Sequence, residues 1–185
     1  MEGERSLVLQ RQRQLKWRAL DWLEKLLMVL CGVTLAAFSL SVVCDIVTRE
    51  IGHPWLWLQE VTSTFFIYGI FIGAAVATRR NDHLYLAAVG DSLTGRPRLI
   101  IETCIRLVMI GVGLFLAGYG YINFLRGFSS FRMPSMTPIA SLYAAIPLSG
   151  ALIALFALEQ LVNGWKNGFE GTAEGELPEE GAGVP

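Results

Sequence analysis

Four long apolar runs constrain the fold of this chain more than any other feature of its sequence. Each is close to the roughly 20 residues that an α-helix needs to cross a hydrocarbon core of about 30 Å. Hydrophobic residues make up 53% of the sequence and charged residues only 17%, more apolar than a soluble domain of 185 residues usually is. The sequence therefore predicts an all-α integral membrane protein with four transmembrane helices. The apolar runs cover residues 26–46, 61–78, 99–124 and 139–158.

The flanks of these runs set the expected domain boundaries. We expect a basic N-terminal segment over residues 1–25, a transmembrane domain over 26–162 and an acidic, disordered tail over 163–185. Pro147 lies inside the fourth span and should kink it, because proline has no N–H for the helical hydrogen-bond ladder. With their flanks included, the four spans are expected at about 26–48, 55–78, 99–124 and 139–162.

Lysine and arginine are unevenly distributed among the segments between the spans. Six precede the first span, whereas the loop after it has only Arg49; the next loop has four and the third has two. Because basic residues near short loops resist translocation, this alternation predicts a bacterial inner-membrane protein with a cytoplasmic N-terminus. An even number of spans returns the C-terminal tail to the same side.

An amphipathic stretch precedes the first span. Leu15, Ala19, Trp22, Leu23 and Leu26 recur with the period of a helix. This pattern predicts a short helix that lies at the cytoplasmic interface before the chain enters the membrane. The alternative is a simple N-terminal extension of the first span.

Small residues form a row along the second span. Gly69, Gly73 and Ala77 are four residues apart, a spacing that lets another helix backbone approach closely. Together with Trp57, an expected headgroup-level anchor at the start of the same span, they are our candidates for contact with a partner. The third and fourth spans have similar rows, which consist of Gly113 with Ala117, and of Ser141, Ala145 and Ser149.

Charged residues gather at the ends of the predicted helices, and we interpret them as helix-end anchors. Asp45 precedes Arg49 by one turn, and Glu60 lies where an acid complements a helix N-terminus. Proton coupling is an alternative role for Asp45 and Glu60. The candidate anchors are Asp45, Arg49, Glu60, Arg79, Arg80, His83, Glu102 and Arg106.

Patterns typical of enzymes and cofactor sites are missing from the sequence. His53 and His83 fall in loops on opposite faces of the predicted membrane, which argues against haem. We find no Walker A sequence, CxxC pair, metal-spaced His/Cys cluster, Ser/His/Asp set or buried carboxylate pair at membrane depth. Basic residues lie beside apolar runs and form no face that tracks phosphates. We therefore expect no catalysis, no cofactor or metal, and no nucleic-acid partner.

Three stretches resemble the small membrane subunit of tripartite ATP-independent periplasmic (TRAP) transporters. The resemblance covers the region from the first span to the fourth. In the second span it includes a Trp and a Glu before an apolar helix that ends in a Gly-Ala pair, basic residues and a loop His. The loop after that His is a loose version of the family pattern, LYLAAVGD. The three stretches are FSLSVVCDIVTRE, WLQEVTSTFFIYGIFIGAAVATRRNDH and SMTPIASLYAAIPLSG.

This resemblance implies a three-part uptake system. A periplasmic binding protein would capture an organic anion, a large membrane subunit would move it with sodium, and this chain would brace the large subunit within the lipid membrane. Two other classes stay open. One is a stand-alone, small proton-coupled exporter, and the other is a membrane anchor or assembly subunit of a different complex.

Overall fold

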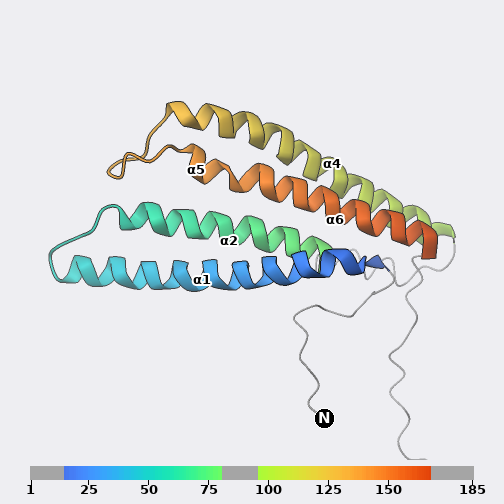
Figure 1. The fold of residues 1–185 in the computed structure, drawn as a ribbon, viewed down its shortest axis with the longest axis horizontal. Coiled ribbons are helices and arrows are strands. Elements are labelled where there is room, and N and C mark those ends of the chain that lie inside the picture. Colours follow the sequence, from blue (N-terminus) through green and yellow to red (C-terminus); the bar gives the residue numbers. More distant parts are fainter. Residues whose placement is uncertain (1–14, 81–95, 168–185) are drawn as a thin grey trace, which may run out of the picture.

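The computed structural model describes residues 15–80 and 96–167 of the chain (Figure 1). Four of its helices are long and apolar enough to cross a membrane, which confirms the predicted all-α membrane fold. Within the described ranges there is no β-strand, and the only β pairing is an isolated bridge between Phe131 and Pro138. In chain order the elements are η2 (Arg18–Leu20), α1 (Asp21–Glu50), α2 (Leu58–Arg80), α4 (Arg96–Arg126), η3 (Gly127–Ser129), α5 (Ala140–Tyr143) and α6 (Ala145–Asn167).

The helices extend beyond the apolar runs from which they were predicted. The 30 residues of α1 and the 31 residues of α4 correspond to about 45 Å of helix. That length matches a bilayer of about 40–45 Å with its headgroups included. The charged residues at both ends of these helices therefore lie at headgroup depth, where water and lipid polar groups can solvate them.

The N-terminal stretch is not a separate interfacial helix in the structure. Residues 16 and 17 are not helical, η2 is a single 3₁₀ turn, and α1 then runs without a break from Asp21 to Glu50. For residues 21–26 the structure thus agrees with the alternative, an extension of the first span. Residues 15–17 pack against the end of α6, so the buried Leu15 does not lie on lipid.

The four long helices form a single layer in the order α1, α2, α6, α4. Figure 1, which looks down the shortest axis, shows two helical hairpins side by side, with α2 and α6 meeting along the middle. Among the described residues, α1 has no Cα within 8 Å of α4 or α6. The described part of the chain is therefore one helix thick, and no other described helix covers either broad face of the layer.

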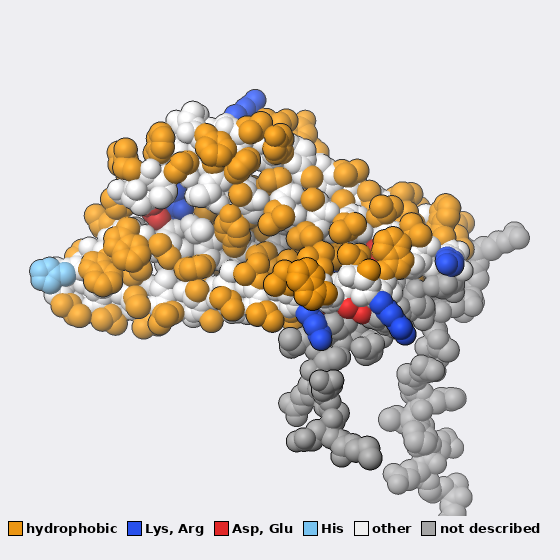
Figure 2. Space-filling model, viewed as in Figure 1, with side chains coloured by type: hydrophobic (Ala, Val, Ile, Leu, Met, Phe, Trp, Pro, Cys, Tyr) orange, Lys and Arg blue, Asp and Glu red, His pale blue; other side chains and the backbone are white. Residues whose placement is uncertain are grey.

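Apolar side chains cover these exposed faces. Figure 2 shows them over nearly the whole of one face of the described region. The buried core is small and lies around α2, with contributions from α1 and α6 on either side; it consists of Leu27, Ile72, Ala75, Val76, Ile153 and Phe156. Since so much apolar surface is stable only when water is excluded, lipid or another membrane protein must cover it.

Glycines set the closest contact in the layer, between α4 and α6. A Cβ atom on Gly150 would lie 2.5 Å from the Ala117 nitrogen, and one on Gly113 would lie 2.7 Å from the Ala154 nitrogen. Because both neighbours are backbone atoms, no side-chain rotation can make room. This packing uses the Gly113 and Ala117 row that the sequence predicted, together with Gly150.

The row on the second span faces α1 of the same chain. A Cβ on Gly69 would meet the Thr34 hydroxyl at 3.3 Å, and one on Gly73 would meet the Cys31 sulfur at 3.5 Å. The Gly69, Gly73 and Ala77 row was our candidate for a partner contact, but Gly69 and Gly73 already have an intramolecular neighbour. Trp57, at the start of α2, is 46% exposed and stacks on Trp55.

The fourth membrane segment is interrupted between α5 and α6. The break is at Ala144, three residues before Pro147. A residue at position 147 would normally donate its N–H to the Tyr143 carbonyl, and proline cannot do so. Gly120 of α4 packs against the proline ring, since a Cβ there would lie 3.0 Å from the Pro147 Cδ.

Candidate functional site

A buried arginine at one end of the layer joins three helices and the N-terminal segment. Arg79 in the last turn of α2 is fully buried. Its Nε donates to Glu159 Oε2 on α6 at 3.1 Å, and its Nη1 donates to Glu24 Oε2 on α1 at 2.5 Å. Its Nη2 donates to Glu159 Oε1, Asp21 Oδ1 and the Trp17 carbonyl at 3.0–3.1 Å. The guanidinium thus bonds in three directions at once.

The acidic partners of Arg79 are also buried. Glu24 and Glu159 are both 0% exposed, and Glu24 forms a second ion pair with Arg80, whose Nε lies 3.1 Å from Glu24 Oε1. Burying an isolated carboxylate costs several kcal/mol, whereas one that is paired and hydrogen-bonded is tolerated. We call Lys16, Asp21, Glu24, Arg79, Arg80 and Glu159 the Arg79 cluster. Its formal charge is zero, with three cations and three anions.

The same cluster holds the N-terminal segment on the layer. The Trp17 backbone N–H donates to Glu159 Oε1 at 2.6 Å, and its indole N–H donates to Asn163 Oδ1 at 2.6 Å. Asn163 in turn donates to the Leu15 carbonyl. Burial lowers the pKa of the neighbouring Lys16 ammonium below its usual value, a shift that Glu24 opposes. These bonds fix residues 15–17 across the ends of α2 and α6.

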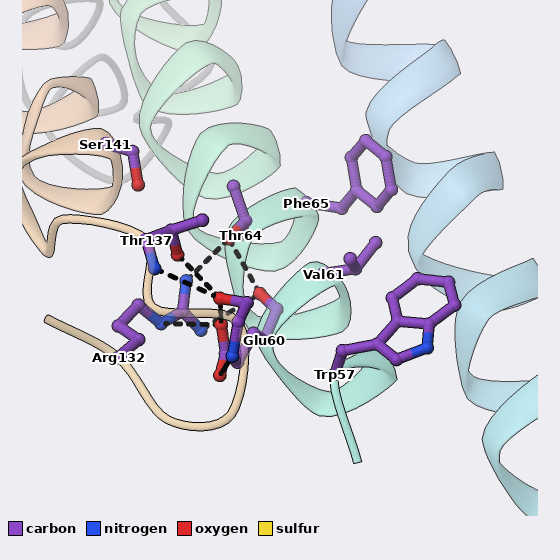
Figure 3. Close-up of a pocket in the computed structure, with 9 residues that line it drawn as sticks. Trp57, Glu60, Val61, Thr64, Phe65, Arg132, Thr137 and Ser141 are labelled. Carbon is purple, nitrogen blue, oxygen red and sulfur yellow. Dashed lines mark hydrogen bonds and ion pairs between the residues drawn. The ribbon is translucent and has the colours of Figure 1, made fainter. Parts of the chain in front are cut away.

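A second polar cluster lies at the opposite end of the layer, between α2 and the loop of residues 130–138. Figure 3 shows Glu60 pointing toward this loop. The Glu60 carboxylate accepts hydrogen bonds from the Ser135 hydroxyl and, at 3.2 Å, from the Ser135 backbone N–H. Arg132 donates to the Glu60 carbonyl at 3.0 Å and to the Thr64 hydroxyl at 2.9 Å. The loop is thereby fastened to the first turns of α2.

A pocket of about 300 Å³ opens beside this loop. Trp57, just before α2, and Val61 and Phe65 in its first turns line the pocket, and Figure 3 shows the three on one side of that helix. The polar groups along its edge are already engaged, since Arg132 donates to the Glu60 carbonyl and the Glu60 carboxylate accepts from Ser135. The pocket is thus an apolar hollow beside a loop that is hydrogen-bonded to α2. Among the described residues, no group of His, Cys, Asp or Glu side chains is arranged to hold a metal ion.

The remaining candidate anchors form local pairs or fall outside the structure. Arg49 Nε lies 2.9 Å from Asp45 Oδ2, one turn away on α1. Arg106 pairs with Glu102 on α4, and its side chain is almost fully buried. His83 and the LYLAAVGD stretch lie outside the described residues.

Sequence reasoning missed the acidic half of the Arg79 cluster. The sequence predicted no buried carboxylate pair at membrane depth, and it did not reveal that Glu24 and Glu159 are both buried at the helix ends. Each is neutralised by arginine, so the pair stabilises the fold and leaves no unpaired acid for chemistry. A signal was present in the fourth span, where Glu159, Gln160 and Asn163 share one face of an otherwise apolar helix. Gln160 uses that face to donate to the Thr78 and Arg79 carbonyls.

A single layer of four apolar helices, held together by polar clusters at its ends, defines a multi-pass helical membrane protein. Residues 38–167 match the family described as tripartite ATP-independent periplasmic transporters, DctQ component, so the chain belongs to that family of TRAP transporter small permease subunits. The match confirms the resemblance noted from the sequence.

Three relatives illustrate the family. The chain is 24% identical over 126 residues to the sialic acid TRAP transporter small permease protein SiaQ of Vibrio cholerae, covering 64% of this chain and 72% of that protein. It is 22% identical over 143 residues to a putative TRAP transporter small permease protein of Haemophilus influenzae, covering 77% and 89%. It is 25% identical over 151 residues to the sialic acid TRAP transporter permease protein SiaT of H. influenzae, where the match covers 78% of this chain but only 24% of the relative.

Proposed function

We propose that this subunit is a static, non-catalytic scaffold for the large membrane subunit of a TRAP transporter. The complete system would take up an organic anion with sodium, and a periplasmic binding protein would deliver the anion. Both termini of the chain would lie in the cytoplasm, which puts the Arg79 cluster on the cytoplasmic side and the 130–138 loop on the periplasmic side.

The observation that carries this proposal is the single layer of helices. A carrier must enclose its substrate and pass it between two gates, and a layer one helix thick has no interior between packed layers in which to do so. Its helices are instead held against one another at both ends by Arg79 and Glu60. A broad, stiff, apolar layer suits a scaffold. Packed against the static part of the large membrane subunit, it would widen the frame past which a moving transport domain slides.

The relatives support separate roles for a small and a large membrane subunit. Two of them are named small permease proteins, and the matching part of SiaT is about a quarter of a longer permease protein. A segment like this chain thus occurs joined to a larger permease, which supports a large membrane subunit as its partner. Two relatives are named for sialic acid, which carries a carboxylate and is a sensible first substrate to test.

The geometry of Asp45 and Glu60 favours structural roles over ion coupling. Asp45 is engaged by Arg49, and Glu60 holds Ser135. Groups that must bind and release an ion in every transport cycle would have to break these bonds each time.

Uptake in proteoliposomes tests the scaffold role. The vesicles contain both membrane subunits and the binding protein, and uptake is normalised to the amount of assembled complex. Asp45→Asn should leave uptake per complex near that of the wild type. Complete loss of uptake with full assembly would place an ion site in this chain and overturn the proposal.

The two alternative functions give different results in simpler experiments. A stand-alone exporter would move a drug or proton when the purified chain is reconstituted alone, whereas a scaffold would not. A subunit of some other complex would co-purify with that complex and not with a large TRAP permease.

A further inference from the structure

We propose that the outward face of η2 and the first turns of α1, formed by Arg18, Trp22 and Lys25, binds the headgroup of an anionic phospholipid. These residues are spaced i, i+4 and i+7, so they share one side of the helix. All three are exposed, and Trp22 is 71% exposed. The opposite side of the same turns carries Glu24 and Leu27, which are buried.

The Arg79 cluster gives this face its positive charge. Glu24 is fully buried and bonded to Arg79 and Arg80, and the carboxylate of Asp21, beside the face, accepts a hydrogen bond from Arg79. The acids of the first turns of α1 are therefore turned toward the interior of the layer. Arg18 and Lys25 have no ion-pair partner among the described residues and remain in contact with the surroundings. Two unneutralised cations thus flank a tryptophan on one face.

An apolar stripe continues this face along α1. Val29, Val33 and Leu40 follow at helical spacing and are 53%, 56% and 66% exposed. A phospholipid changes in the same general way along its length, from a phosphate and ester groups at the depth where tryptophan is favoured to an acyl chain. The phosphate would lie between Arg18 and Lys25, with the glycerol esters beside Trp22 and the acyl chain along Val29 and Val33.

Charge argues for an anionic lipid over both a zwitterionic lipid and a protein partner. Each Lys or Arg near an anionic membrane surface contributes about a fivefold gain in affinity, which a zwitterionic headgroup does not supply. The cores of protein interfaces are depleted in lysine, so an unpaired Lys25 next to an unpaired Arg18 is a poor centre for a helix contact. Trp165 and Lys166, both exposed, repeat the pairing of aromatic and cation at the end of α6.

Lipid competition on the purified full-length chain tests this proposal. The fluorescence of Trp22 is obtained as the difference between the wild type and Trp22→Phe, in mixed micelles at low salt that contain brominated phosphatidylglycerol or brominated phosphatidylcholine. Brominated phosphatidylglycerol should quench Trp22 at a concentration roughly 25-fold lower, because each of the two cations contributes about fivefold. The double variant Arg18→Gln/Lys25→Gln should lose most of that preference, as expected for about fivefold per cation. The matched control, Arg49→Gln/Arg126→Gln, removes two cations from the other end of the layer and should keep the preference.

Several results would overturn the proposal. Equal quenching of Trp22 by the two lipids would show that the face does not select charge, and an equal effect of the two double variants would show that only net charge matters. Relief of quenching by millimolar glycerol phosphate would identify a site for a soluble phosphate. If Trp22 is not quenched by either lipid in the complex with the large membrane subunit, the face is a protein interface. If Arg18→Gln/Lys25→Gln unfolds, raising salt to 0.5 M in the wild type should abolish the preference by screening, and a salt-independent preference would refute the proposal.

Discussion

Replacing Arg79 with Met should destabilise the layer far more than the loss of any exposed ion pair. Methionine retains an unbranched apolar side chain but removes the charge and the five hydrogen bonds that the guanidinium donates. Arg80 still neutralises Glu24, so the main loss is at Glu159, which is left buried without its arginine partner. Breaking one side of a buried pair costs about 3–5 kcal/mol, and we expect a loss of that size.

Two further variants separate this cause from a general effect of lost charge. Arg49→Met breaks the pair with Asp45, whose arginine is 44% exposed, and should cost no more than about 0.5 kcal/mol. Adding Glu159→Gln to Arg79→Met removes the stranded carboxylate and should restore at least about half of the lost stability.

The free energy of unfolding is measured by titrating SDS into mixed micelles of the purified chain and following helix content. Size-exclusion chromatography before the titration checks that each variant starts as a monodisperse protein. Losses for Arg79→Met and Arg49→Met that agree within about 1 kcal/mol would refute the argument that burial makes the Arg79 cluster strong. So would a double variant that is less stable than Arg79→Met alone.

Three other predictions follow from the packing, the loop and the proposed orientation. Gly150→Ala should lower the SDS midpoint, because its Cβ would lie 2.5 Å from backbone, whereas Gly73→Ala, which meets a sulfur at 3.5 Å, should not; equal effects would contradict the packing. Glu60→Gln should speed proteolysis within the 130–138 loop while uptake per assembled complex stays near normal; unchanged cleavage would mean that Glu60 does not hold the loop. In a chain whose native cysteines are replaced, a cysteine at position 129 should react with impermeant thiol reagents from the periplasm and one at position 91 from the cytoplasm; labelling of both from one side would exclude the proposed topology.

The number and type of the long helices could be predicted from sequence because they depend on local properties. The length of an apolar run and the demand for satisfied backbone bonds in lipid are read from consecutive residues. The helix ends were less predictable, since α1 and α4 extend into headgroup depth where polar residues are tolerated. The N-terminal stretch was ambiguous for the same reason, as an interfacial helix and an extension of the span have the same periodicity.

The Arg79 cluster could not be predicted because it depends on which helices are neighbours. Arg79 was recognised as a residue at a helix end, but its partners lie 55 and 80 residues away in sequence. Glu24 and Glu159 each look like an ordinary acid next to a membrane segment. Only the packing of α2 between α1 and α6 turns three separate helix ends into one buried cluster.

The composition of the Arg79 cluster has a consequence for biogenesis. Translation completes α1 and α2 first, and this hairpin already contains Lys16, Arg79 and Arg80 against Asp21 and Glu24, an excess of one positive charge. Arg79 can therefore be largely neutralised while the second hairpin is still being synthesised. Glu159 supplies the missing negative charge when α6 arrives. The α1–α2 hairpin therefore carries one excess positive charge when it enters the membrane, and this charge favours its packing against α6. Neutralisation of the Arg79 cluster thus follows the order in which the helices are synthesised.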